Sequence, residues 1–253
     1  MSEKPQLGTV EEHGANVPQI VDAILENLPS EQEQTVDLPS RSKFYVLKDP
    51  SEGVKVRPMD FSDEKAIVQA SNKESINVLL SRCVSNIDIN QLLQFDKLYL
   101  LMKIREVSFG AEYTVDVMCN DCTAKNSITF SIDTFKCKRV PEDLEDPREV
   151  FLEMIGKPAK VRFPRIQDEV YIADSGKIMD NLWRFVMEID GNGNKAVIGK
   201  VIQKLPSKDV HILMNNIFGS DYGLSTRGQF KCDECASIQI AELPIGSDFF
   251  TLS

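Results

Sequence analysis

Two pairs of cysteines, each with two residues between the thiols, are the part of this sequence best suited to chemistry. Cys119 and Cys122 form the first pair, and Cys232 and Cys235 form the second. Thiolate sulfur is a preferred ligand of zinc, and this spacing lets one turn present both thiols to the same ion. Together the pairs supply the four ligands of a tetrahedral site. The sequence therefore predicts one structural zinc ion per chain, bound by these four cysteines.

The residues around each pair predict that it lies at the tip of a β-hairpin. Hydrophobic residues alternate on both sides of the first pair, over residues 111–133, and of the second pair, over residues 228–243. A redox pair of the thioredoxin type needs its first cysteine at a helix N-terminus, so flanking strands argue against that interpretation. Six cysteines in 253 residues are too few for a disulfide scaffold. An iron–sulfur cluster also takes four cysteines, so the residues leave iron open as the alternative metal.

No enzyme motif accompanies the cysteines. Four thiolates complete the coordination shell of zinc and leave no open position for water or substrate. The sequence has no GxSxG, no phosphate-binding GxxxxGKS/T, no HExxH and no strand-linked GxGxxG. Its only histidines, His13 and His211, are too few for a histidine-based acid–base site. We therefore expect a protein that is not an enzyme and has no small-molecule substrate.

Two further features resemble sites but are better explained without one. Cys83 and Cys137 have no cysteine two residues away, so we interpret them as buried or incidental thiols. Residues 190–201 begin like a calcium loop, with oxygen ligands at positions one, three and five: Asp190, Asn192 and Asn194. The loop has Lys195 where glycine is required and Val201 where an acidic ligand is required, so we expect a flexible turn.

Composition narrows the class of protein. With 42% hydrophobic residues the chain can bury a sizeable core, and it has no run of eighteen apolar residues that would cross a membrane. The first residues lack the apolar stretch of a secretory signal, and the two Cys-x-x-Cys pairs indicate the reducing cytosol. A net charge of −10 argues against attraction to nucleic acid or to an anionic membrane. We expect a soluble protein with neither as a partner.

Residues 1–40 are predicted to form an amphipathic helix and a linker. Asn16 followed by Pro18 is typical of a helix start. The apolar residues after it recur at helical spacing: Val17, Ile20, Val21, Ile24 and Leu28. The next stretch, SEQEQTVDLPSRS at residues 30–42, is polar and contains proline, as linkers do. The helix either packs back onto the core or docks into a groove on a partner.

Residues 41–253 are predicted to form a single main domain. Within KFYVLKDPSEGVKVRPMD, two short strands are expected on either side of a turn at residues 49–53. A helix is expected to begin at Asp63, with Ser62 as its cap. A helical insertion is expected between the hairpins, over residues 141–220.

The strongest helical pattern is QFDKLYLLMKIREVSF, which ends at Gly110. Its apolar stripe is wide, so we expect this helix to be central and buried. Gly110 is expected to take a left-handed conformation that ends the helix and starts the first hairpin. Arg105 lies on the same helix, and we expect it either to pair with a carboxylate or carbonyl group or to extend to the surface.

The insertion is predicted to hold three helices, at residues 146–156, 175–190 and 207–218, and one short strand, AKVRFPRI at residues 159–166. Ser207 is the expected N-cap of the last, and Gly219 its C-cap. The resulting fold class is α+β: a mainly helical domain with a zinc-ribbon-like pair of β-hairpins and a tethered N-terminal amphipathic helix.

Two passages, VKVRPMDFSDEKAIVQA and FDKLYLLMKIREVSFGAEYTVDVMCNDC, resemble signature segments of the T4-like contractile-phage baseplate hub proteins. The matching positions are Arg57, Pro58, Met59, Glu64, Lys65, Asp96, Arg105, Ser108, Phe109, Gly110, Tyr113 and the first cysteine pair. The resemblance extends over roughly residues 54–245 and leaves out the N-terminal helix.

This resemblance implies a non-enzymatic part in building the hub of a contractile tail baseplate, either as a virion component or as a transient assembly factor. The implied partners are other hub proteins or the tape-measure protein, or a second copy of the chain. The implied location is the host cytoplasm during assembly, or the virion tail. A zinc-ribbon adaptor in transcription or nucleic-acid binding is the alternative function, although the residues between the cysteines would repel phosphate: Asn120, Asp121, Asp233 and Glu234.

Overall fold

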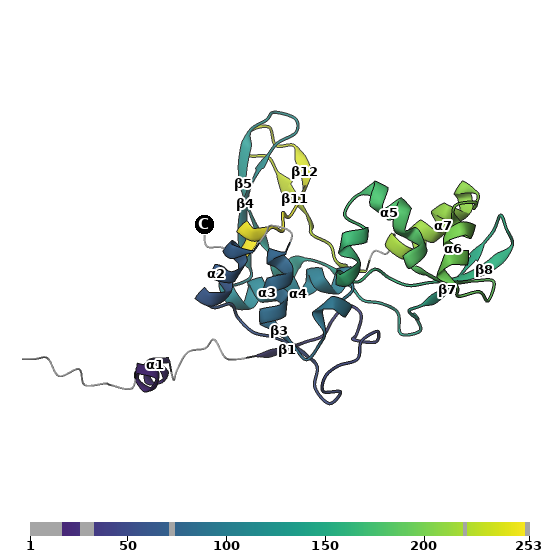
Figure 1. The fold of residues 1–253 in the computed structure, drawn as a ribbon. Coiled ribbons are helices and arrows are strands. Elements are labelled where there is room, and N and C mark those ends of the chain that lie inside the picture. The colour runs from purple at the N-terminus through teal and green to yellow at the C-terminus, as the bar shows by residue number, and fades with distance from the viewer. Residues whose placement is uncertain (1–16, 26–32, 71–73, 220–221, 251–253) are drawn as a thin grey trace, which may run out of the picture.

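The structure of the protein is a computed structural model that describes residues 17–25, 33–70, 74–219 and 222–250. Helices alternate with antiparallel sheets along this part of the chain, so the expected α+β class is confirmed. The buried hydrophobic residues form two clusters. The first cluster is built mainly from residues 38–132 and 230–250, and the second cluster from residues 150–217. Figure 1 shows the helices of the two clusters side by side.

The first cluster contains a three-stranded antiparallel sheet. Its strands are β1 (Gln34–Val36), β2 (Val54–Val56) and β3 (Val84–Ser85), in that order. The linker expected over residues 30–42 is therefore wrong from β1 onward, and Leu38 beyond it is fully buried. A three-residue strand with two exposed polar residues carries too little alternation to be recognised in a sequence.

The residues around β2 also differ from expectation. Residues 43–48 form turns and irregular chain and not the expected strand, because β1 and β3 already occupy both edges of β2. The next helix, α2 (Phe61–Gln69), is capped by Asp60 and not by Ser62. Asp60 and Asp63 each accept the other's backbone N–H, which forms a capping box.

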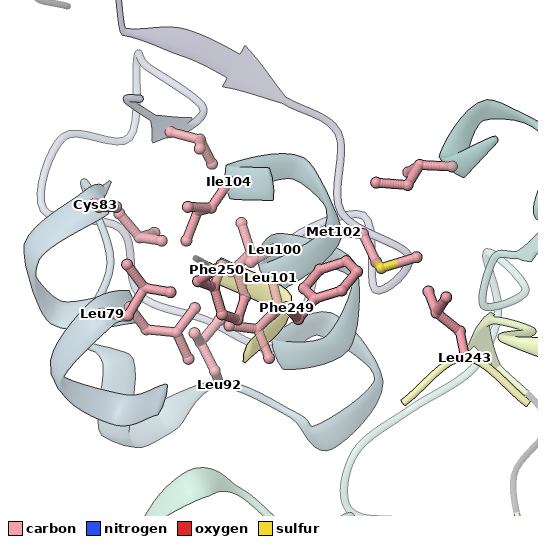
Figure 2. Packing of buried hydrophobic residues seen from close by; sticks show 14 of the residues in the cluster. Leu79, Cys83, Leu92, Leu100, Leu101, Met102, Ile104, Leu243, Phe249 and Phe250 are labelled. Carbon is pink, nitrogen blue, oxygen red and sulfur yellow. The ribbon is translucent and has the colours of Figure 1, made fainter. Parts of the chain in front are cut away.

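Two further helices complete the first cluster, α3 (Ser75–Cys83) and α4 (Gln94–Phe109). As predicted, α4 is buried, with Leu100 and Ile104 fully enclosed. Figure 2 shows Phe249 and Phe250 beside Leu100 and Leu101 of this helix. These phenylalanines belong to a C-terminal turn, η6 (Ser247–Phe250). The end of the described chain therefore helps to close the core around α4.

Gly110 ends α4 with φ 91° and ψ 172°. The positive φ agrees with the predicted glycine-dependent turn. The ψ angle differs from the left-handed helical value and places the residue in a region that is essentially restricted to glycine. In this conformation the chain turns from the helix into the first hairpin within two residues.

Two hairpins project from the first cluster, side by side in Figure 1. One pairs β4 (Glu112–Met118) with β5 (Lys125–Ser131), and the other pairs β11 (Arg227–Lys231) with β12 (Ile238–Glu242). Each directs alternate residues into the first cluster: Val115 and Phe130 from one hairpin, Phe230 and Ala241 from the other. At their base, β6 (Cys137–Lys138) pairs with β10 (Gly223–Leu224).

The second cluster packs helices against another three-stranded antiparallel sheet. Its strands, in order, are β7 (Arg148–Leu152), β8 (Lys157–Val161) and β9 (Val186–Ile189). Its helices are α5 (Ser175–Asn181), α6 (Lys195–Ile202) and α7 (Ser207–Phe218). Residues 141–219 are thus a mixed sheet-and-helix unit, where the sequence suggested a mainly helical insertion with one short strand at residues 159–166, a strand that β8 bears out in part.

Two of the three helices expected in this unit are corrected by the structure. Residues 146–156 form β7 and a turn, because Val150 and Leu152 point inward in strand alternation while Phe151 is exposed. Residues 175–190 split into α5, a short turn and β9. The third helix, α7, begins as predicted, although Pro206 and not Ser207 occupies the N-cap position, and Gly219 ends it.

The N-terminal helix α1 (Val17–Leu25) forms as expected and lies apart from both clusters in Figure 1. Its side chains Ile20, Val21 and Ile24 are exposed. Leu28, the last apolar position of the predicted helix, lies outside the described residues. None of the described helices is long and apolar enough to cross a membrane.

Candidate metal centre

The four predicted ligands, Cys119, Cys122, Cys232 and Cys235, meet at the tips of the two hairpins. Their Sγ atoms all lie within 4.8 Å of one another. Cys119 Sγ is 3.6 Å from Cys235 Sγ, and Cys122 Sγ is 3.6 Å from Cys232 Sγ. Sulfur atoms bound tetrahedrally to one zinc ion lie about 3.8 Å apart, given a zinc–sulfur bond of about 2.3 Å. The four thiols are therefore spaced to bind a single metal ion.

Each cysteine pair begins an eight-residue segment that we call a knuckle: residues 119–126 and residues 232–239. Both knuckles are closed by the same two backbone hydrogen bonds. In the first knuckle, the N–H of Cys119 donates to the carbonyl of Ala124 at 2.8 Å, and the N–H of Thr123 donates to the carbonyl of Cys119 at 2.9 Å. In the second, the N–H of Cys232 donates to the carbonyl of Ser237 at 2.9 Å, and the N–H of Ala236 donates to the carbonyl of Cys232 at 3.0 Å. Thr123 and Ala236 supply the required positive φ, at 61° and 60°. These turns point both sulfurs of a pair to one side.

A side-chain amide from each hairpin also holds the opposite knuckle. The Asn126 side-chain oxygen accepts the backbone N–H of Asp233, at 2.9 Å. The Gln239 side-chain oxygen accepts the backbone N–H of Asn120, at 3.0 Å. Sequence reasoning missed both amides. The available signal was a carboxamide residue at the fourth position after the second cysteine of each pair.

The sulfur environments of the two pairs are similarly arranged. The first cysteine of each pair is buried and the second is exposed. Backbone N–H groups of Cys235 and Glu234 favour the Cys232 thiolate and lower its pKa to about 6. The N–H of Ala124 favours the Cys122 thiolate, but lost solvation and the neighbouring sulfurs outweigh it and raise that pKa to about 12. Four thiolates this close repel one another unless a cation lies between them.

Chemically, such a centre stabilises structure. All four ligands come from the protein, so an ion bound by them has no position for a reactant. The centre joins residues that are more than a hundred positions apart in the sequence, and the second cluster lies on the loop between them. An ion bound there would fix the two hairpins to each other.

The remaining cysteines lie outside this centre. Cys83 is buried in the first cluster, where its thiol contacts Asp63 Oδ2 at 3.6 Å, and burial raises its pKa to about 12. Cys137 is exposed on β6. Both positions agree with thiols that take no part in the metal centre.

The calcium-like loop and the histidines have ordinary structural surroundings. The Asn194 side chain caps α6 by accepting the N–H of Ala196 at 2.9 Å, and Asp190 pairs with Lys157 at 2.8 Å on the surface. The flexible turn expected over the whole loop therefore ends at α6. His211 is exposed on α7, and His13 lies outside the described residues.

Arg105 has neither of its predicted environments. It is 7% exposed, and its Nε and Nη1 atoms are buried without a hydrogen-bond partner among the described residues. Its guanidinium carbon lies 4.6 Å from the ring centre of Phe109, 5.5 Å from that of Tyr113 and 5.8 Å from that of Phe249. Burial lowers the pKa of Arg105 from its usual value, partly offset by Tyr113. Aromatic faces therefore replace the expected carboxylate.

Comparison with known proteins gives one match. A protein-family model described as T4 bacteriophage base plate protein matches residues 35–251. No curated protein and no solved structure matches the chain. The matched range contains both clusters and both knuckles, and it leaves out α1.

Proposed function

Because the chain belongs to the T4 bacteriophage base plate protein family, we propose that it is a non-enzymatic component or assembly factor of the baseplate hub of a contractile tail. The family gives the chain a structural part in a phage baseplate. The observation that supports the proposal most is the extent of the match, which covers both clusters. Acidic knuckle residues, among them Asp121 and Asp233, favour protein partners over the phosphate backbone of a nucleic-acid target.

The metal that we propose is one structural zinc ion per chain, bound by the four clustered cysteines. Hairpin knuckles with four thiolates favour zinc over iron, because they resemble the closed tetrahedral sites of zinc ribbons. Elemental analysis of the purified full-length protein should find about one zinc ion per chain and little iron. A folded protein without metal, or one with mainly iron, would contradict this assignment.

Loss of one ligand should be much more damaging than loss of a cysteine elsewhere. Cys232→Ser should bind little zinc and accumulate as insoluble protein, because metal binding at such sites is coupled to folding. Cys137→Ser is the matched control, since that thiol is exposed and outside the cluster. An unchanged melting temperature for the Cys232 variant would mean that the two knuckles do not share an ion.

We further propose that α1 makes the contacts with other baseplate hub proteins or with the tape-measure protein. Its apolar side chains, such as Ile20 and Ile24, are exposed. An isolated helix of nine residues is marginal in water, so a surface that covers its apolar face would stabilise it. During assembly in the host cytoplasm, that surface would belong to a partner or to a second copy of the chain.

A truncation tests this role for α1. Removing residues 1–32 leaves β1 in place, and the product should remain soluble and bind zinc but no longer co-purify with the hub and tape-measure proteins of the same phage. In the full-length chain, Ile24→Asp should have the same effect, whereas Gln19→Asp on the same helix should not. Aggregation of the truncated protein would instead place α1 in the protein's own core.

A further inference from the structure

The sequence contains two similar segments, one in each half of the chain. VKVRPMDFSDEKAI at residues 54–67 and AKVRFPRIQDEVYI at residues 159–172 share Lys-Val-Arg, Asp-Glu and the final isoleucine at the same spacing. Further along, FGAEY at residues 109–113 corresponds to FGSDY at residues 218–222. Each is followed by a Cys-x-x-Cys pair. Three short similarities therefore occur in the same order in the two halves of the chain.

The repeated segments have the same hydrogen bonds. Both terminal nitrogens of Arg57 donate to the carboxylate of Asp63, at 2.7 and 3.1 Å. Arg162 donates to Asp168 in the same way, at 2.6 and 2.9 Å. In both, the arginine also donates to the carbonyl of the next residue, at 2.8 and 3.1 Å. The backbone N–H three residues after each arginine donates to the same carboxylate: Asp60 to Asp63 at 3.0 Å, and Arg165 to Asp168 at 2.9 Å. The cap residues Asp60 and Arg165 also have similar backbone angles, φ −112° and ψ 174° against φ −117° and ψ 169°, so the chain enters the following helical turn in the same way in both segments.

The surrounding elements correspond as well. Each segment begins in the middle strand of a three-stranded antiparallel sheet, β1-β2-β3 in one case and β7-β8-β9 in the other. The backbone N–H of the arginine donates to a carbonyl just before the third strand, Cys83 at 3.0 Å or Phe185 at 2.9 Å. The two sheets therefore share strand order and the placement of the arginine.

The α4 helix of the first half and the α7 helix of the second half each carry a buried aspartate in the first turn. Asp96 is the third residue of α4, and Asp209 is the third residue of α7. Both are fully buried, and both accept backbone N–H groups from the segment after the first strand: Ser40 at 3.0 Å, and Met154 at 2.9 Å. The helices differ by about one turn, with 16 and 12 residues. Helix α6 has no counterpart among the described residues of the first half.

The metal centre itself is close to twofold symmetric. The closing hydrogen bonds, the positive φ angles and the sulfur–sulfur distances agree between the knuckles to within about 0.1 Å or a degree. The amides of Asn126 and Gln239 make the same bond in opposite directions, each to the residue after the first cysteine of the other knuckle. Such reciprocity is the property of an interface between two copies of one surface.

We propose that the chain is an internal duplication, with copies over residues 34–135 and 148–250, and that its metal centre is a clasp between two copies of one self-complementary hairpin. The surface that each hairpin presents is therefore an interaction surface whose partner is a second copy of the same hairpin. In this chain the two copies are covalently joined. The inference rests on the proposed metal site and is independent of the hub role.

Exchanging the knuckles in the full-length chain tests this. One variant carries CDECASIQ in place of CNDCTAKN at residues 119–126, and the other carries CNDCTAKN at residues 232–239, so each holds the same knuckle twice. Both should still bind about one zinc ion per chain, because every position corresponds. Loss of zinc or of solubility in both variants, with the wild type binding zinc, would overturn the duplication. A wild type without zinc would overturn the metal assignment instead.

A milder pair of variants measures the symmetry directly. Asn126→Ala and Gln239→Ala each free one N–H of the opposite knuckle, and both should lower zinc affinity by a similar factor of about tenfold. Gln229→Ala, on the exposed side of β11, is the control and should have no effect. Competition with a chromogenic chelator measures all three. A large effect from only one of the two amides would mean that the knuckles are not equivalent copies.

Discussion

Gly110 lies where α4 turns into the first hairpin, and its replacement by alanine should destabilise the protein. The residue has φ 91° and ψ 172°, where a side chain on Cβ is strongly disfavoured by the backbone on either side. A Cβ atom added at this position would meet no other atom within 4 Å. The cost of the substitution is therefore a backbone cost and does not depend on crowding by neighbouring elements.

The magnitude follows from two opposing effects. Holding a residue other than glycine in this region costs about 1–3 kcal/mol. Alanine also reduces the conformational freedom of the unfolded chain, which returns about 0.4–1 kcal/mol. The free energy of unfolding should therefore fall by about 1–2 kcal/mol, which for a chain of this length lowers the melting temperature by about 3–6 °C. Gly110→Val should cost at least as much, because β-branching restricts the residue further.

Urea denaturation followed by circular dichroism measures the difference. Gly246→Ala is the matched control, because a Cβ there also meets nothing and its φ is not positive. The control should be unchanged or slightly more stable, by up to about 1 kcal/mol. If Gly110→Ala proves as stable as Gly246→Ala, the positive φ is not a constraint on the fold, and the reasoning fails.

Two charged residues of the first cluster give further predictions. Burial disfavours the charged form of Asp63, but hydrogen bonds from Arg57, Asp60 and Arg82 outweigh it and lower the pKa to about 2. The ionised Asp63 should therefore contribute about 2–3 kcal/mol to the free energy of unfolding above about pH 4, and this contribution should disappear as the pH falls through 2. In Asp63→Asn, the urea concentration at the unfolding midpoint should depend less on pH over that range than in the wild type. Arg105→Met should lie within about 1 kcal/mol of the wild type, since the lost ring contacts and the removed unpaired N–H groups offset each other. Arg105→Ala should cost about 2–4 kcal/mol in lost packing, and an equal cost for both variants would reveal a hydrogen-bond partner of the guanidinium.

The features that sequence reasoning found are those specified locally. The spacing within each cysteine pair, the wide apolar stripe of α4 and the glycine at its end each depend on residues within a few positions of one another. The structure brings the cysteines together and ends the helix at Gly110, as expected. The identity of the metal and the division into domains remain predictions.

The features that were missed depend on tertiary contacts. Phe151, Met154 and Ile155 recur at helical spacing, and only the pairing of residues 148–152 with β8 shows that they form a strand. Ile189 continues the helical spacing from Leu182, yet it lies in a strand because β9 pairs with β8 as the third strand of the sheet. Arg105 was expected to pair with a carboxylate or carbonyl group or to extend to the surface, because the local sequence does not show that the ring of Phe249, far along the chain, packs against it.

A metal ion bound by the four cysteines would also decide how a pulling force passes through the molecule. Tension applied between β1 and η6 would travel through the first cluster and cross directly from Cys122 to Cys232 through the bound ion. The second cluster lies on the loop between those cysteines and would carry no tension while the centre is intact. Rupture of the centre would release that loop, which spans on the order of 380 Å when fully extended. Residues 148–218 would thus bear tension only after the bonds to the ion break and the hairpins separate.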